Sequence, residues 1–193
     1  MIITTMNEAL VRIQSWSRAE KLLLKSFAAA LFAFLTFLAA EVRIPIPFTP
    51  IPMTLQTFIA PLAGGFLGSL WGAGSMLLYM GLGIAGLNVF AVASGGLDFF
   101  IAPSAGYVVG FVLSAFILGW VQTRTTKNSY MLAGLILSHL VIFVCGVSGL
   151  MWNAQMTAPE AFAKGVAPFL IGDVFKISAS FVVLASYNRL RRN

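Results

Sequence analysis

Charged residues are scarce in this 193-residue chain, at 9% of the total against 59% hydrophobic residues. Soluble domains carry about 25% charged residues, and their surfaces need that charge for solubility. The 54 positions between Arg43 and Asp98 contain no charged residue. These values exclude a water-soluble globular fold, and the chain is predicted to be an integral membrane protein.

Cysteine and histidine occur once each, as Cys145 and His139. One cysteine excludes a disulfide scaffold, and one histidine without neighbouring carboxylates makes no metal site. No G-x-x-x-x-G-K-[ST], H-E-x-x-H or G-x-S-x-G motif occurs. The chain is therefore expected to bind no ATP through a P-loop, no metal and no cofactor, and to catalyse no hydrolysis.

Six apolar segments are long enough to cross a bilayer, because about 20 residues at a rise of about 1.5 Å each span the hydrocarbon. They form one all-α transmembrane domain over residues 1–193, with spans at 22–40, 55–70, 72–90, 104–121, 130–150 and 166–187. Residues 1–21 precede the first span. They mix apolar and charged side chains, and are predicted to form a short amphipathic segment on the inner membrane surface.

The basic residues indicate the orientation of these spans. Nine of the twelve lie near the two termini or in one short loop, namely Arg12, Arg18, Lys21, Lys25, Arg124, Lys127, Arg189, Arg191 and Arg192. Cytoplasmic loops carry such an excess of Lys and Arg. Both termini and residues 122–128 are therefore placed in the cytoplasm, and residues 41–54, 91–103 and 151–165 outside. The pattern marks a polytopic membrane protein and predicts no nucleic-acid partner.

Two of the predicted outer loops are unusual. Residues 44–52, which include Phe48, hold four of the eight prolines, and alternating prolines exclude a helix and favour an extended strand. Because this loop is apolar and stiff, it is expected to cover the helix bundle. The other loop contains Gly95 and Gly96, and paired glycines permit close backbone approach. The alternative for both loops is simple connection.

The sixth predicted span contains Asp173 and Lys176, three residues apart and so on one helix face. A charge at membrane depth costs roughly 2.5–3.5 kcal/mol on insertion scales, which makes such a pair a candidate functional site. With a span beginning at Val166, Asp173 would lie about 10 Å deep in the outer half of the membrane. The pair could bind a ligand from outside, or could serve only as an ion pair in helix packing.

Four further polar residues near the outer ends of the spans could contact a ligand. Gln56 could instead cap a helix, and Tyr107 could anchor at the membrane interface. Asn88 and Asn153 are similarly ambiguous.

Small residues recur at intervals of four, in two glycine series and one alanine pair. Such spacing lets helix backbones approach closely. Packing within the bundle suffices to explain the glycines, which are Gly64, Gly68, Gly72, Gly106 and Gly110. For Ala29 and Ala33 in the first span, contact with a partner membrane protein is an alternative.

Five segments resemble the BioY family, the biotin-specific substrate-binding (S) components of energy-coupling factor vitamin transporters. They lie in family order and spacing: IPIPFTPIPMTLQ (44–56), APLAGGFLG (60–68), GLNVFA (86–91), APSAGYVVGF (102–111) and GDVFK (172–176). Two departures are visible on the rim of the loop between the third and fourth spans. Asn88 stands where the family usually has proline, and Ala102 and Ala105 where it often has glycine.

The resemblance implies a six-helix bundle in the cell membrane with a biotin pocket near the outer face, under the proline-rich loop. It also implies a transmembrane T component that meets Ala29 and Ala33, and two ATPases that supply the missing P-loops. ATP would be used only by those partners, although some members are found without a dedicated ATPase module. An S component for another vitamin, or a membrane-embedded transferase, are the alternative functions.

Overall fold

The computed structural model describes residues 17–92 and 95–192, and most of these residues are helical. Of the predicted amphipathic segment (residues 1–21), residues 1–16 lie outside the described residues. Residues 18–21 belong to the first described helix. In chain order the elements are α2 (Arg18–Glu41), β1 (Arg43–Ile44), β2 (Met53–Thr54), α3 (Gln56–Leu67), α4 (Ser69–Ile84), η1 (Gly96–Ile101), α5 (Ala105–Arg124), α6 (Asn128–Asn153), α7 (Ala158–Gly165), η2 (Ala167–Phe169) and α8 (Leu170–Arg192).

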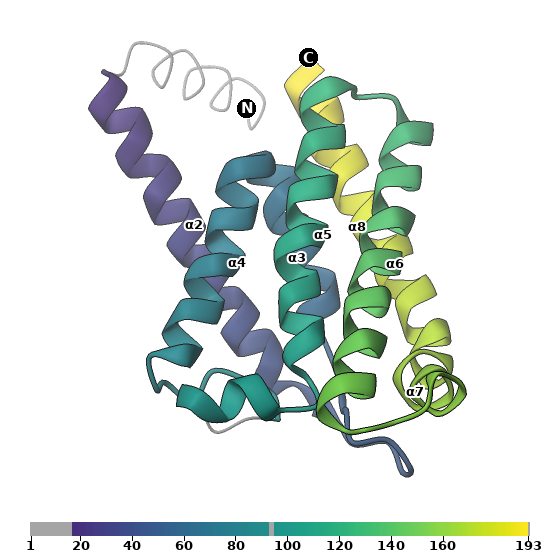
Figure 1. Ribbon diagram of the computed structural model, residues 1–193. Coiled ribbons are helices and arrows are strands. Elements are labelled where there is room, and N and C mark those ends of the chain that lie inside the picture. The colour runs from purple at the N-terminus through teal and green to yellow at the C-terminus, as the bar shows by residue number, and fades with distance from the viewer. Residues whose placement is uncertain (1–16, 93–94, 193) are drawn as a thin grey trace.

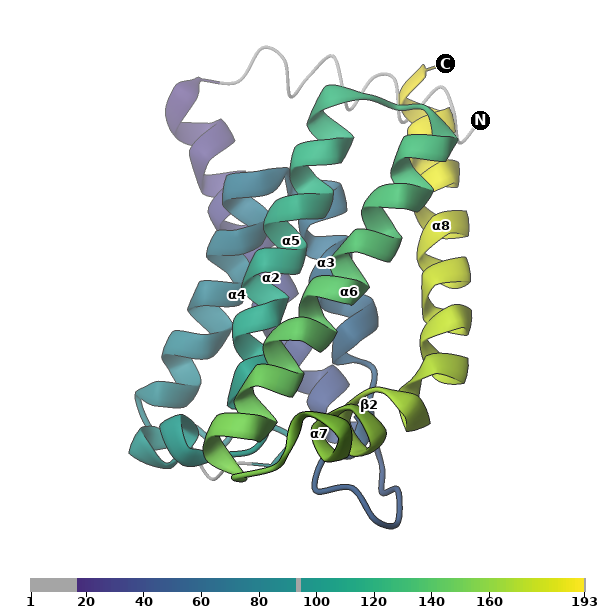
Figure 2. The same ribbon diagram turned by 45° about the vertical axis from the view of Figure 1, so that its right-hand side comes forward.

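The long helices run side by side between two ends of a bundle (Figure 1). The start of α2, the end of α8 and the short α5–α6 connection lie at one end. The β1–β2 hairpin, η1 and α7 lie at the other, which we call the hairpin end; Figure 2 shows the same arrangement from a second direction. Helices α3, α4, α5 and α6 pack closely, whereas α8 contacts mainly α3 and α6.

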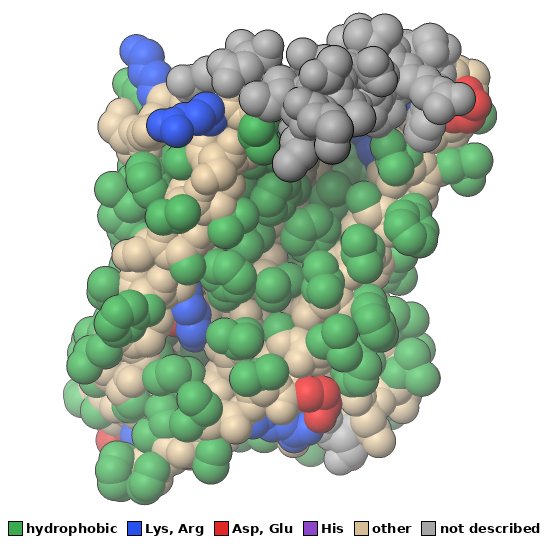
Figure 3. Space-filling view, turned by 180° about the vertical axis from the view of Figure 1, so that it is seen from behind, with side chains coloured by type: hydrophobic (Ala, Val, Ile, Leu, Met, Phe, Trp, Pro, Cys, Tyr) green, Lys and Arg blue, Asp and Glu red, His purple; other side chains and the backbone are tan. Residues whose placement is uncertain are grey.

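The surface of the bundle suits a bilayer. Four helical stretches, Arg18–Glu41, Ala105–Arg124, Asn128–Asn153 and Ala158–Leu190, are long and apolar enough to cross one. Figure 3 shows apolar side chains over the middle of one face, with most charged side chains near the two ends. Large apolar side chains such as Leu23, Val144 and Phe175 are exposed on the long helices. The prediction of an all-helical membrane protein is confirmed.

Two predicted spans are shorter in the structure. The segment predicted at 55–70 is α3, with 12 residues, and the segment predicted at 72–90 is α4, with 16. At about 1.5 Å per residue these helices are about 18 and 24 Å long. Gly68, at φ +85°, makes the turn between them, and the chain leaves α4 at Ile84.

The sixth predicted span also begins elsewhere. It was expected to begin at Val166, but α8 begins at Leu170, after a turn that contains Pro168. Asp173 therefore lies in the first turn of α8, nearer the hairpin end than expected. The preceding helix α7 was predicted as loop. Its N-cap is Thr157, whose backbone N–H and hydroxyl donate to the Glu160 carboxylate at 3.0 and 2.8 Å, and a Thr-x-x-Glu capping box is a sequence signal for such a start.

Glycines let the central helices approach to backbone contact. A Cβ on Gly64 would collide with the backbone of Ala115 in α5, and a Cβ on Gly72 would collide with Gly64 itself. Gly106 of α5 faces the Cys145 backbone of α6 in the same way. Gly64, Gly72 and Gly106 therefore serve packing within the bundle, as predicted, whereas Gly68 serves the turn.

Gly64→Ala is expected to lower the free energy of unfolding by about 2–3 kcal/mol, because overpacking forces α3 and α5 apart. The matched control is Gly74→Ala on α4, where an added Cβ meets nothing within 4 Å. Thermal unfolding in detergent measures both. Equal melting temperatures for the two variants would contradict the packing argument.

Candidate functional site: a buried charged pair under the hairpin

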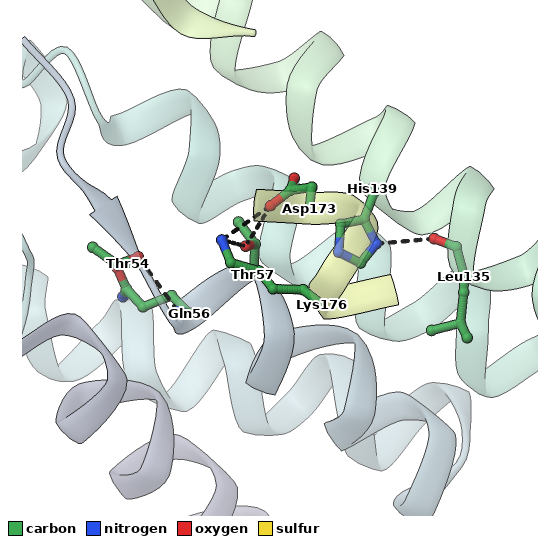
Figure 4. A network of polar contacts seen from close by, with 7 residues as sticks. All are labelled: Thr54, Gln56, Thr57, Leu135, His139, Asp173 and Lys176. Carbon is green, nitrogen blue, oxygen red and sulfur yellow. Dashed lines mark hydrogen bonds and ion pairs between the residues drawn. The ribbon is translucent and has the colours of Figure 1, made fainter. Parts of the chain in front are cut away.

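Asp173, Lys176 and Thr57 form a buried hydrogen-bonded triangle (Figure 4). The Lys176 ammonium donates to Asp173 Oδ1 at 2.9 Å and to Thr57 Oγ1 at 2.8 Å. The Thr57 hydroxyl in turn donates to Asp173 Oδ1 at 3.3 Å. The pair on α8 is thus joined to the first turn of α3. Thr57 was not a predicted site residue.

The triangle leaves hydrogen-bonding capacity unused. An ammonium has three N–H donors, and two of those on Lys176 are bound by Asp173 and Thr57. Both donors to Asp173 reach the same oxygen, Oδ1, so Oδ2 has no donor among the described residues. The site is close to neutral overall, yet offers one strong donor and one strong acceptor side by side. Such a site suits a polar group that both accepts and donates.

A cavity at the hairpin end borders this triangle. It has about 540 Å³ of empty space, including the part open to the surroundings, and only about 40 Å³ admits the centre of a water molecule. That is room for a few waters, so the cavity is narrow as it stands. Its walls come from the hairpin, the loop after α4, and helices α3, α5, α6 and α8: Ile51, Pro52, Thr54, Gln56, Thr57, Phe90, Ala91, Val92, Ser104, Tyr107, Val108, Phe111, Phe143, Phe169, Asp173 and Lys176.

The hairpin closes over this cavity. Its strands pair antiparallel, Arg43 with Thr54 and Ile44 with Met53, and its buried Ile51 lines the cavity. The Arg43 guanidinium also donates to the Ala91 carbonyl at 2.9 Å, across to the loop after α4. The proline-rich segment thus excludes a helix, as predicted, but turns back on itself as a hairpin.

Gln56 lines the cavity, and its side-chain amide is already bound within the chain. It donates to the Tyr79 hydroxyl at 2.6 Å and accepts from Thr54 Oγ1 at 3.2 Å. Tyr79 continues the chain of bonds by donating to the Val89 carbonyl at 2.9 Å. This network links the hairpin to α3, α4 and the loop that follows α4.

Tyr107 and Asn153 make comparable links. The Tyr107 hydroxyl donates to the Gly165 carbonyl at 2.7 Å, and its ring lines the cavity. Asn153 donates from Nδ2 to the Ala102 carbonyl at 2.8 Å and is not among the lining residues. The first bond joins α5 to the end of α7, and the second joins the end of α6 to the segment before α5.

Four other predicted contact residues do not line this cavity. Asn88 lines a separate groove between α2 and α4. Phe48 lies in the hairpin turn with 84% of its surface exposed and a φ of +69°. Gly95, at φ +86°, precedes η1, and Gly96, at φ +69°, is the first residue of η1. Around the cavity the structure brings together Asp173, Lys176, Gln56 and Tyr107, and it leaves these four residues and Asn153 outside the lining.

Ala29 and Ala33 face the bundle to which they belong. They are 7% and 2% exposed, because α2 packs on α3 and α4. The helix surface that remains exposed carries larger side chains, including Phe27, Leu31 and Phe34. Contact between the two alanines and a partner would require their present neighbours to move, and it stays a prediction.

His139 of α6 is a buried neighbour of the charged pair (Figure 4). Its Nδ1 lies 3.0 Å from the Leu135 carbonyl, and its buried Nε2 has no partner among the described residues. Asp173 and Lys176 are the charged groups that act on its ring electrostatically. The sequence showed only a lone histidine, and no local pattern indicated that α6 brings it to α8.

Thr57→Val is expected to lower the free energy of unfolding by about 1.5–3 kcal/mol. Valine has nearly the shape of threonine but no hydroxyl, so the Lys176 ammonium loses one hydrogen-bond acceptor. Thr57→Ser keeps the hydroxyl and is the matched control. Thermal unfolding in detergent compares the two. A valine variant as stable as the serine variant would show that the hydroxyl is dispensable.

Comparisons with known proteins place the chain in a family. The profile of the BioY family matches residues 11–193. The probable biotin transporter BioY of Pyrococcus horikoshii is 35% identical over 155 residues, which cover 80% of this chain and 90% of that protein. The biotin transporter BioY of Thermotoga maritima is 30% identical over 162 residues, covering 84% and 94%.

A solved structure has the same fold. It is the S-component for biotin from an ECF-type ABC transporter, with a TM-score of 0.80 at 23% identity, over 93% of this chain and 96% of that one. Because the family profile covers all but the first ten residues and the relatives align over most of their own length, the chain belongs to the BioY family.

Proposed function

We propose that this protein captures biotin in the cavity beneath the hairpin, as the substrate-binding component of a membrane uptake system. The observation that carries the proposal is the Asp173–Lys176–Thr57 triangle, which lines an apolar, aromatic-walled cavity and retains one unused acceptor and one unused donor. The names of the relatives, biotin transporters, support it.

The polar and apolar groups of biotin match the residues that line the cavity. Its ureido ring has two N–H donors and one carbonyl acceptor, so Asp173 accepts from the ring and Lys176 donates to its carbonyl. The alternative orientation pairs Lys176 with the biotin carboxylate. In either case the ligand completes the bonds of a buried charged pair, while Phe90, Phe111 and Phe143 contact its alkyl chain and thioether.

The proposed topology has six membrane-crossing helices, α2 to α6 and α8, in the cell membrane. Arg18, Lys21 and Arg124 belong to the end opposite the hairpin, and a cytoplasmic location for that end follows the positive-inside rule. Both termini then lie inside the cell and the hairpin outside, where the cavity can take up ligand from the exterior.

The proposed partners are a transmembrane T component and two ATPases, in addition to biotin and the lipid bilayer. The structural neighbour is an S-component from an ECF-type ABC transporter, which supports such an assembly. This chain has no P-loop motif, so ATP hydrolysis would be carried out by the partners, and no cofactor is needed here.

Equilibrium binding of the purified full-length protein to a panel of water-soluble vitamins tests the proposal. We expect saturable binding of biotin, and affinities at least about 100-fold weaker for riboflavin, thiamine and folate, which lack a ureido ring on an alkyl acid. Tighter binding of another vitamin would assign the protein to that substrate, and absence of biotin binding would refute the proposal.

A further inference from the structure

A second hollow lies directly behind one wall of the biotin cavity. It is a groove between α6, α7 and α8 with about 1090 Å³ of empty space, including the part open to the side. Its lining is almost wholly apolar, with exposed side chains such as Val144, Val174 and Phe162. In a bilayer these side chains would face hydrocarbon.

The cavity and the groove share two lining residues, Phe143 and Asp173. Asp173 is held by Lys176 and Thr57, so its carboxylate is fixed from the α3 side. Phe143 is 9% exposed and makes no polar contact, being held by apolar packing alone. Its ring is therefore the part of the wall between the two spaces that a substitution can remove without breaking a polar contact.

Phe143 lines both spaces, and in this it differs from Phe90 and Phe111, which line only the cavity. Phe111 and Phe90 are 3% and 4% exposed, belong to the same apolar core, and do not line the groove. Truncating either of them widens the cavity toward packed protein, whereas truncating Phe143 joins the cavity to an existing groove. The narrow cavity can gain length in the direction of Phe143 because empty apolar space, not packed protein, lies behind it.

We propose that Phe143 is a specificity-determining residue that limits the length of the ligand by closing the biotin cavity toward the α6–α8 groove. The inference rests on the proposed function, and adds that the alkyl chain of biotin runs along Phe143. With the ring present, ligands that carry a bulky apolar group beyond this chain are excluded. With the ring removed, that group enters the groove.

The test compares two amides of biotin, the methylamide and the anilide, which both lack the carboxylate and differ only in bulk. The dissociation constant of each is measured for the wild type, Phe143→Ala and Phe111→Ala. We expect the wild type to bind the anilide at least about 30-fold more weakly than the methylamide, and Phe143→Ala to reduce this ratio to about threefold or less. Phe111→Ala should leave the ratio near the wild-type value.

Two further variants protect the test against misfolding and indirect effects. Phe143→Leu removes less volume than Phe143→Ala, and should partially reduce the anilide-to-methylamide ratio of dissociation constants. It replaces the alanine variant in the test if that variant does not fold. Val147→Phe, added to Phe143→Ala, places a ring in the groove one helical turn away and should restore discrimination against the anilide.

The possible failures are distinguishable. If the wild type does not bind biotin, the proposed function fails. If biotin binds but the anilide-to-methylamide ratio is the same in the wild type and both Phe143 variants, or falls equally in Phe111→Ala, then Phe143 does not separate cavity from groove and the inference is overturned.

Discussion

Asp173→Asn and Lys176→Met are each expected to weaken biotin binding by at least about 100-fold, equivalent to about 2.8 kcal/mol. Each substitution removes one of the two groups that meet the ligand, and also leaves its buried partner without a counter-charge. Breaking a buried ion pair in this way costs about 3–5 kcal/mol. Isothermal titration or tryptophan fluorescence with the purified variants measures the loss.

The loss of affinity must be separated from loss of fold. The double variant Asp173→Asn with Lys176→Met removes both charges, so it is expected to recover much of the stability lost in each single variant but none of the binding. Asp98→Asn removes an exposed carboxylate at the hairpin end and serves as the control. Wild-type affinity in both single variants would remove the triangle from the site.

Shortening the hairpin is expected to speed biotin release by about 100-fold with a smaller change in the association rate, because affinity differences act mostly through dissociation. Residues 45–52 can be replaced by Asn-Gly, since Ile44 and Met53 are paired strand neighbours and a two-residue turn joins such a pair. The change removes Ile51 and Pro52 from the cavity and keeps the register of β1 and β2.

Stopped-flow measurement of biotin dissociation tests this prediction. Ile51→Ser, which alters one buried contact within an intact hairpin, should show an intermediate rate. The Phe48 side chain is exposed in the structure, so its predicted contact with the ligand is a separate question. The biotin dissociation rate of Phe48→Ser tests that contact. An unchanged dissociation rate in the shortened variant would contradict a covering role for the hairpin.

The features that can be predicted from the sequence are local ones. Long apolar runs predict membrane helices because a span is a local property of about 20 consecutive residues. Asp173 and Lys176 share a helix face at a spacing of three, and the structure joins them at 2.9 Å. The proline-rich hairpin and the Thr157–Glu160 cap are likewise short patterns, although only the first was interpreted from the sequence.

Other features depend on contacts between distant segments. Thr57 meets Lys176 across 119 positions of sequence, and His139 reaches the pair from a different helix. Ala29 and Ala33 have a spacing typical of any close helix contact, and the spacing does not say which helix they contact. Asn88 and Tyr107 lie at similar positions near the ends of predicted spans, yet only Tyr107 lines the cavity.

The sequence by itself therefore determined that the chain is a helical membrane protein and indicated the family, and it predicted a charged pair within a membrane span and a stiff apolar loop. The tertiary structure decided which polar groups meet that pair, which face of α2 is covered, and that Phe143 and Asp173 line both the cavity and a side groove. The physical reason is that periodicity specifies the face of each helix, whereas the rotation and neighbours of that helix are set by packing against residues far away in the chain.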